Sequence, residues 1–317
     1  MEFIDLHSDT AMHIYEFDKK LSKNDICIDI EKLKNGQALA QFFAMFIEKD
    51  RGFDSYDYCK AMLSKFKKEI EINKNEISLC RNYSDLEIAK RENKIGAFLT
   101  IEEGDAIKGD IEKLREFKKE GISLMTLTWN FENDLGFPNA GFKFKDKGLK
   151  DKGIEIVDEM NKLGMLIDVS HLSDAGFYDC IKYSKQPIIA SHSNARVQSP
   201  HPRNLTDDML RKLSNNGGIT GINFCSAFLI NRNDVLDSEM ARIDDMTRHI
   251  KHIRNIAGID VIALGSDFDG IENDVEIKDA SQMMKLADAL SKEGFNITEI
   301  EKIFSGNAIR IIKDVLK

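Results

Sequence analysis

Histidine and acidic residues stand at the ends of five apolar runs in this sequence of 317 residues. They are His7 and Asp9 in "FIDLHSDT", Glu102 and Glu103 in "AFLTIEEGD", His171 in "LIDVSHLSD", His192 in "PIIASHSN", and Asp267 and Asp269 in "IALGSDFDG". Imidazole and carboxylate groups together are the ligands that suit zinc or another borderline divalent metal. Because side chains alternate between the two faces of a strand, residues 7 and 9 should point the same way. The pattern therefore indicates a metal site built from strand ends.

The number of these groups favours two metal ions over one. Three histidines and three carboxylates exceed the four ligands of a structural zinc, but they suffice for two ions if one carboxylate bridges them. Two ions at ~3.5–4 Å can share a water molecule, lower its pKa and polarise a substrate carbonyl. A carboxylate that does not bridge could then move protons between that water and a leaving amine.

Each of these motifs has a simpler reading when it is taken alone. "HSD" can cap or anchor a loop, "IEEGD" can be an exposed acidic turn, and the aspartates of "SDFDG" can accept hydrogen bonds from backbone amides in a turn. Their joint occurrence at the ends of five strands favours a metal site. We expect His13 and His201 not to be ligands, and Trp129 to be a pocket wall and not a reactive group.

Eight apolar runs predict the strands that must position these groups: 2–7, 38–47, 95–102, 122–129, 164–171, 187–192, 217–223 and 260–267. Segments with helical periodicity alternate with them: 56–75, 110–120, 151–163, 174–184, 206–215, 240–257, 279–292 and 298–316. Apolar strands that alternate with helices are typical of a parallel sheet covered by helices. Eight such units, with no glycine-rich nucleotide fingerprint, favour an α/β fold of the (β/α)8, TIM-like barrel class over an open doubly wound sheet. The carboxyl ends of the strands in such a barrel share the rim at which barrel enzymes build their active sites.

Composition narrows the range of partners and surroundings. The net charge of −9 argues against a nucleic-acid or anionic-membrane partner. The five cysteines are dispersed with no CxxC pair, which fits a reducing cytoplasm. We expect no signal peptide and no membrane span, because the charged start "MEFIDLHSDT" resembles neither and no apolar run is long enough. Because the chain has only four prolines and no linker-like segment, we expect one domain over residues 1–317. Residues 11–37 show no strong helical pattern, so we assign no element to them.

Several motifs, in the same order, resemble those of the zinc dipeptidases related to membrane (renal) dipeptidase. "DLHSDT" resembles the opening metal motif of that family, "LTIEEGDAI" its bridging-glutamate motif, and "LIDVSHLSD" and "PIIASHSNAR" its two later histidine motifs. "HPRNLTDDML" resembles the segment with its substrate-binding arginine, and "ALGSDFDG" the segment with its catalytic aspartate. The resemblance covers nearly the whole chain. It implies a somewhat distorted (β/α)8 barrel that hydrolyses dipeptides and that can form a homodimer. Some members of the family accept dipeptides with a D-residue at the carboxyl terminus.

The resemblance also implies roles for single residues. His7 and Asp9 would bind one zinc ion, His171 and His192 the other, and Glu102 would bridge the two, with Glu103 as the alternative bridge. Asp267 would carry protons beside the metals in an attack by a bridging hydroxide. Arg203 would hold the substrate carboxylate, although it could instead pair with Asp207 or Asp208 in a structural loop clamp.

One position departs from the family pattern. Trp129 stands where renal-type members carry a histidine that contacts the tetrahedral intermediate. An indole donates one hydrogen bond but carries no positive charge, so either Asn130 or Trp129 Nε1 supplies that contact, or the contact is missing.

Two other functions share the motifs: an amidohydrolase for N-acyl amino acids, lactams or cyclic amides, and a barrel that binds without catalysis. The complete ligand set argues against the second.

Overall fold

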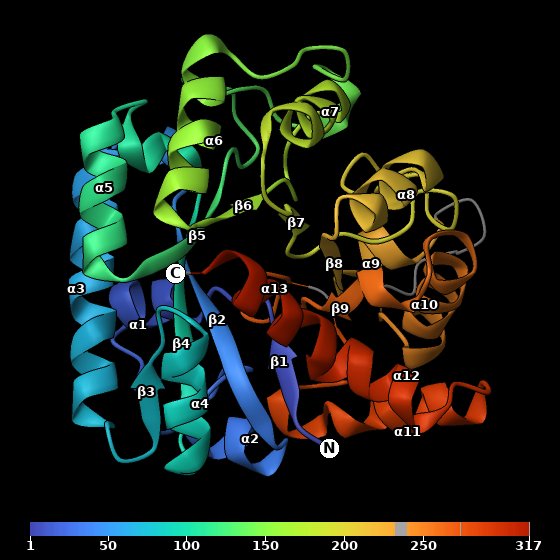
Figure 1. The fold of residues 1–317 in the computed structure, drawn as a ribbon. Helices are drawn as coiled ribbons and strands as arrows, with labels where there is room; N and C mark the ends of the chain where they lie inside the picture. Colours follow the sequence, from blue (N-terminus) through green and yellow to red (C-terminus); the bar gives the residue numbers. More distant parts are fainter. Residues whose placement is uncertain (232–239, 273, 317) are drawn as a thin grey trace.

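The computed structural model describes residues 1–231, 240–272 and 274–316, and nine parallel strands form its centre (Figure 1). The strands are β1 (Phe3–Asp5), β2 (Ala38–Phe46), β3 (Ile77–Leu79), β4 (Ile95–Glu102), β5 (Ile122–Thr126), β6 (Leu166–Asp168), β7 (Ile189–Ala190), β8 (Ile219–Ile222) and β9 (Ile262–Leu264). Parallel strands need long crossover connections, which is why helices lie between them in the sequence.

Eight of these strands close into a ring. The order β2-β1-β9-β8-β7-β6-β5-β4 is completed by a pairing of β2 with β4, which runs from Ala40 opposite Gly96 to Phe46 opposite Glu102. The short strand β3 stands outside the ring and pairs with the first residues of β4. The predicted (β/α)8 barrel is therefore confirmed, with β3 as an addition to it.

Helices surround the ring of strands in Figure 1. They are α1 (Thr10–Phe17), α2 (Ile30–Asn35), α3 (Ser55–Ile72), α4 (Tyr83–Arg91), α5 (Ile111–Glu120), α6 (Asp151–Leu163), α7 (Asp174–Tyr183), α8 (Asp207–Asn215), α9 (Ser226–Leu229), α10 (Ile243–Ala257), α11 (Met284–Lys292), α12 (Ile297–Glu301) and α13 (Asn307–Val315). Local signals set their bounds, as α5 shows. The Asp110 side chain accepts a hydrogen bond from the amide of Glu112 at its start, and Gly121 ends it with a φ of 107°, a conformation that costs glycine little.

The barrel interior is apolar at one end and polar at the other. Phe42 and Phe98 stack inside the ring with their centroids 4.6 Å apart, and they belong to the same buried cluster as Ile311 and Ile312 of α13. Figure 1 shows α13 lying across the ring. Because α13 packs on residues from the starts of the strands, it closes the amino-terminal end of the barrel. The carboxyl-terminal end is left for polar groups.

The structure corrects several of the predicted elements. Strand β3 was not predicted, because a run of three residues between two helices is too short to show a period. Helices α1 and α2 occupy part of residues 11–37, where no strong helical pattern was found. The expected strands 122–129, 164–171 and 187–192 are longer than β5, β6 and β7. Their apolar runs continue past the hydrogen-bonded ladder into the loops at the barrel rim.

Two further features concern the chain as a whole. Within the described residues, no helix is long and apolar enough to cross a membrane. Cys27, Cys59, Cys80, Cys180 and Cys225 are all unpaired thiols.

Candidate metal centre

The carboxyl ends of the strands surround a pocket of about 860 Å³. Four residues with expected metal or catalytic roles line it: Asp9 after β1, Glu102 at the end of β4, His171 after β6, and Asp267 after β9. His7 after β1 and His192 after β7 are buried beside Glu102. These six residues come from the ends of five different strands, so only the closed ring brings them together.

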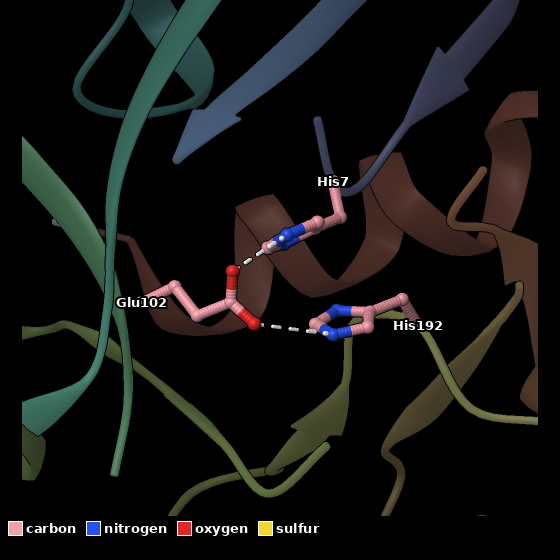
Figure 2. Close-up of side chains that lie close together, drawn as sticks. All are labelled: His7, Glu102 and His192. Atoms are coloured by element: carbon pink, nitrogen blue, oxygen red, sulfur yellow. Dashed lines mark ion pairs between the residues drawn. The ribbon is translucent and has the colours of Figure 1, made fainter. Parts of the chain in front are cut away.

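Glu102 lies at the centre of the group. Its Oε2 atom is 3.1 Å from Nε2 of His7, whereas its Oε1 atom is 3.0 Å from Nε2 of His171 and 3.5 Å from Nε2 of His192. Figure 2 shows the carboxylate between His7 and His192, with one oxygen directed at each ring. A single carboxylate therefore contacts imidazoles on both sides, which is the geometry of a bridging ligand.

Two further carboxylates lie near His7. Nε2 of His7 is 3.5 Å from Oδ1 of Asp9 and 3.7 Å from Oδ1 of Asp267. The ligand atoms of His7, Asp9 and Asp267 all lie within 4.8 Å of one another, and so do those of His7, Glu102 and His192. Because His7 belongs to both groups, the two groups adjoin.

Burial and neighbouring charges set different protonation states for the three histidines. Burial alone would lower the pKa of His7, but the carboxylates of Glu102 and Asp9 offset it and raise the pKa of His7 well above its usual value. Burial, aided by the positive charges of Arg203 and His7, lowers the pKa values of His171 and His192 well below the usual value. These two rings are neutral imidazoles, the form that binds metals.

The same burial acts on Glu102. It raises the pKa of Glu102 to about 8, although the charge of His7 opposes the shift. Since Glu102 and His7 are in contact and both pKa values are raised, the pair retains a proton at neutral pH when no cation is bound. A divalent cation would take the place of that proton.

The unpaired atoms of the group fit a divalent metal centre. Within the described residues, Nδ1 of His7 has no hydrogen-bond partner, and Nε2 of His7 and Oδ1 of Asp9 are buried near other ligand atoms without a well-aligned hydrogen bond. The Nε2 atoms of His171 and His192 face each other at 3.1 Å, within hydrogen-bond distance, and both lie beside Glu102. Buried polar atoms that lack partners are costly in a folded protein. Nitrogen and oxygen ligands that converge in this way are what zinc and similar ions require.

Glu103, the alternative bridge, points elsewhere. Its carboxylate accepts hydrogen bonds from the amide of Trp129 at 2.9 Å and from the amide of Asp105 at 2.8 Å, and Asn133 Nδ2 donates to it as well. Its backbone has a φ of 99° and a ψ of 102°, which is a strained conformation for a residue with a Cβ atom. The turn directs Glu102 toward the histidines and lets Glu103 hold the loop that follows β5.

Asp267 occupies a turn that places it against the group. Its φ is 63°, and its Oδ2 atom accepts a hydrogen bond from Nδ2 of Asn223 at 2.8 Å. Burial raises the pKa of Asp267, although the charge of His7 opposes the shift. Three residues later, a Cβ atom on Gly270 would lie 2.3 Å from Oδ2 of Asp9 and 2.8 Å from Oδ1 of Asp267. Glycine is needed there because the backbone passes so close to both carboxylates.

Arg203 reaches the base of the pocket, and no acid of the described residues forms an ion pair with it. Its side chain is 4% exposed, donates to the carbonyl oxygens of Ser170 and His192, and leaves Nε without a partner. Its guanidinium lies 5.2 Å from the centroid of the Phe228 ring. Burial lowers the pKa of Arg203, while the more distant Asp267 and Glu102 oppose the shift.

The loop clamp considered for Arg203 is not formed. Oδ1 of Asp207 is 2.8 Å from Nε2 of His252, and Oδ2 of Asp208 accepts a hydrogen bond from the hydroxyl of Tyr178 at 2.8 Å. Both acids are thus engaged on the outer surface. The backbone carbonyls and the Phe228 ring hold Arg203 in place instead.

Trp129 and Asn130 line the pocket beside His171. The Trp129 indole packs edge-on against Phe46, with the ring centroids 4.9 Å apart. Oδ1 of Asn130 is 3.1 Å from Nδ1 of His171, so this amide orients a candidate metal ligand. His13 and His201 lie outside both groups of candidate ligands found in the described residues.

Some polar residues of the centre were not singled out in the sequence. Asn223 follows β8 by one residue and holds Asp267; Ser191 and Asp168 stand behind His192. The one available signal was position, because Asn223 follows an apolar run just as the histidines do. Serine and asparagine are too common at strand ends for that signal to have singled them out.

Comparison with known families and proteins gives consistent results. The family model for membrane dipeptidase, peptidase family M19, matches residues 1–317. The chain is 32% identical over 268 residues to an uncharacterised protein from the pqqA 5′ region of Klebsiella pneumoniae, covering 83% of this chain and 97% of the relative. It is 30% identical over 329 residues to an uncharacterised dipeptidase of Schizosaccharomyces pombe, covering 98% of this chain and 76% of the relative.

Solved structures share the fold. A metallo peptidase from Rhodobacter sphaeroides, crystallised with a phosphinate mimic of the dipeptide L-Ala-D-Ala, superposes with a TM-score of 0.90 at 22% identity, over 99% of both chains. A dipeptidase of family M19 superposes with a TM-score of 0.89 at 23% identity, over 100% of this chain and 99% of the other. At these identities the likeness establishes the shared barrel.

Proposed function

This chain belongs to the membrane dipeptidase family and is a metal-dependent dipeptidase, and we propose that it cleaves dipeptides at a centre of two divalent ions, with zinc as the metal. The contacts of Glu102 carry the proposal, because one of its oxygens lies beside His7 and the other beside His171 and His192. His7 and Asp9 would hold one ion, His171 and His192 the other, and Glu102 both.

The protein groups around the ions have separate tasks. Two ions at these residues would supply an activated water molecule and polarise the peptide carbonyl. Asp267 would take up the proton of that water and deliver it to the leaving amine. Its environment supports this role: Asn223 holds Oδ2, Oδ1 faces the centre near His7, and burial raises its pKa toward the range of a proton carrier.

Arg203 would bind the terminal carboxylate of the dipeptide. A buried guanidinium whose Nε has no partner needs an anion, and a carboxylate matches its planar fork. The backbone carbonyls that hold the guanidinium belong to the segments of His171 and His192. The bound carboxylate would therefore set the distance from the substrate terminus to the metal ligands.

Asn130 is the better candidate for the contact that a histidine makes in renal-type members. Its Oδ1 atom faces His171, so its Nδ2 amino group can donate to the oxygen of the tetrahedral intermediate. Trp129, packed on Phe46, would form the wall beside it. This arrangement supplies a neutral donor in place of a charged one.

The substrate class is tested with matched peptides. We expect the zinc-loaded protein to hydrolyse L-Ala-L-Ala and L-Ala-D-Ala, and we propose the second because the Rhodobacter sphaeroides structure holds a mimic of that dipeptide. N-acetyl-L-Ala-L-Ala should be a much poorer substrate. Faster cleavage of the acetylated peptide would instead identify an amidohydrolase for N-acyl amino acids, and no cleavage of any of the three would contradict the proposal.

We also propose a cellular location and an oligomeric state for this protein. The five unpaired cysteines support a reducing, cytoplasmic setting. The family resemblance supports a homodimer.

A further inference from the structure

The outer nitrogen of His192 is held by a short chain of hydrogen bonds. Nδ1 of His192 lies 2.7 Å from Oγ of Ser191, and the same Oγ lies 2.6 Å from Oδ2 of Asp168. Asp168 ends β6, and Ser191 follows β7 directly. All three residues are fully buried.

The surroundings of Asp168 determine which way these hydrogen bonds run. Oδ1 accepts from the amides of Ser170 and Ser191 at 3.0 and 2.9 Å and from Oγ of Ser170 at 2.7 Å. Oδ2 accepts from Oγ1 of Thr126 at 2.6 Å and from Oγ of Ser191. A carboxylate only accepts hydrogen bonds, so these five donors leave the Ser191 hydroxyl proton pointing at Asp168. Having one proton, that hydroxyl must accept from His192.

We propose that Asp168, acting through Ser191, holds His192 in the tautomer that carries its proton on Nδ1 and its lone pair on Nε2. Asp168 and Ser191 are thus positioning residues for a metal ligand. The inference rests on the proposed metal centre, toward which Nε2 of His192 is directed. Outer partners of metal-binding histidines orient the ring and raise its basicity in this way.

The three candidate histidine ligands differ in the group that holds their Nδ1 atom. Nδ1 of His171 faces a neutral amide oxygen of Asn130, and Nδ1 of His7 has no hydrogen-bond partner in the part of the chain that the structure describes. Within the described residues, His192 is the one of the three whose Nδ1 atom is linked, through Ser191, to a buried carboxylate. The backbone behind it is also tightly packed, because a Cβ atom on Gly221 or Gly265 would come within 2.0 Å of the Ser191 carbonyl oxygen. The position of Ser191 behind the His192 ring is therefore fixed by its neighbours.

Two substitutions test the chain of hydrogen bonds, and one serves as a control. Ser191→Ala removes the acceptor for the Nδ1 proton. Asp168→Asn places an amino group beside Ser191, which turns the serine hydroxyl toward His192 and moves the ring proton to Nε2. Thr126→Val removes a hydrogen bond from the same carboxylate without touching the link to His192.

Zinc affinity is the first measurement, made by competition with a chromophoric chelator on metal-free protein. Ser191→Ala and Asp168→Asn should each weaken the binding of one zinc ion by ~10–100-fold, the usual effect of losing an outer partner. Thr126→Val should bind both ions as the wild type does. Equal affinities in all four proteins, or equal losses in all three variants, would overturn the inference.

The ring tautomer is the second measurement, made by ¹⁵N NMR on metal-free protein. Wild-type His192 should show a protonated Nδ1 and a bare Nε2, and Asp168→Asn should shift the population toward protonated Nε2. A wild type with its proton on Nε2 overturns the inference even if neither variant folds. Because this experiment uses no metal, it separates the two claims: a wild type that binds no zinc contradicts the proposed centre, whereas the tautomer tests Asp168 and Ser191 alone.

Discussion

Replacing Arg203 with alanine should lower kcat/KM most for substrates that have a free terminal carboxylate. The guanidinium is buried against the carbonyls of Ser170 and His192, and within the described residues no acid forms an ion pair with it. A dipeptide carboxylate would supply the missing negative charge. The substitution therefore removes one partner of a buried charge pair as soon as substrate binds.

The size of the effect follows from the burial of that pair. Truncating one partner of a buried, hydrogen-bonded charge pair costs ~2–5 kcal/mol. At about 1.4 kcal/mol for each factor of ten, the loss in kcat/KM for a free dipeptide is roughly 30- to 4,000-fold. The upper part of this range is expected, because Arg203 is only 4% exposed and solvent screens it little.

The assay compares a dipeptide with its C-terminal amide in the wild type and in Arg203→Ala. Removing the guanidinium also removes its hydrogen bonds to two carbonyls beside His171 and His192, and that structural loss should affect acid and amide equally. The difference between the two losses isolates the carboxylate contact. The zinc content of the variant is measured first. Equal losses on the acid and the amide would refute the proposed substrate orientation.

Two other predictions concern the proton balance of the site. Asp267→Asn should keep near-normal zinc content while kcat falls by roughly 10²–10⁴, the range of a lost general acid–base group; zinc loss measured before kinetics would make Asp267 a ligand instead. Zinc binding at pH 7 should release a proton, because burial raises the pKa of Glu102 to about 8 and Glu102 and His7 together retain one. Zinc affinity should therefore fall as pH drops from 8 to 6, and calorimetry in buffers of different ionisation enthalpy should detect the proton; a pH-independent affinity would contradict this.

The same raised pKa values affect the stability of the metal-free protein. A group whose pKa is higher in the folded than in the unfolded state stabilises the fold below its unfolded pKa, and this stability is lost as pH rises through the folded pKa. Glu102 and His7 both act in this direction. His171 and His192 have lowered pKa values, so they destabilise the fold as pH falls below the usual pKa of histidine.

The residues at the strand ends were predictable because the barrel imposes a simple rule. Continuous apolar runs mark strands that are buried on both faces, and in a closed parallel barrel the first polar residues after each run reach one rim. His7, Glu102, His171, His192 and Asp267 all follow this rule, and the structure brings them together. Glu102 faces the histidines, whereas Glu103 turns away at a strained backbone position, and the choice of Glu102 over Glu103 as the metal bridge stays a prediction.

Other features depend on contacts that no local pattern contains. The path of the loop that carries Arg203 has no period, so its hydrogen bonds to the carbonyls of Ser170 and His192 could not be foreseen. Asp168 read as an ordinary strand residue, and its five donors converge only when β5, β6 and β7 are in register. Strand β3 likewise exists because it pairs with β4, and not because of its three residues.

The central claim is that Glu102 joins two metal sites, and zinc stoichiometry tests it most directly. Elemental analysis after reconstitution should find two zinc ions per wild-type chain, and Glu102→Gln should lose both together, since Glu102 contacts histidines on both sides. Glu103→Gln, the matched control one residue away, should keep both, because Glu103 holds the loop with Trp129. Loss of both ions in Glu103→Gln but not in Glu102→Gln, or full activity in metal-free wild type, would contradict the account.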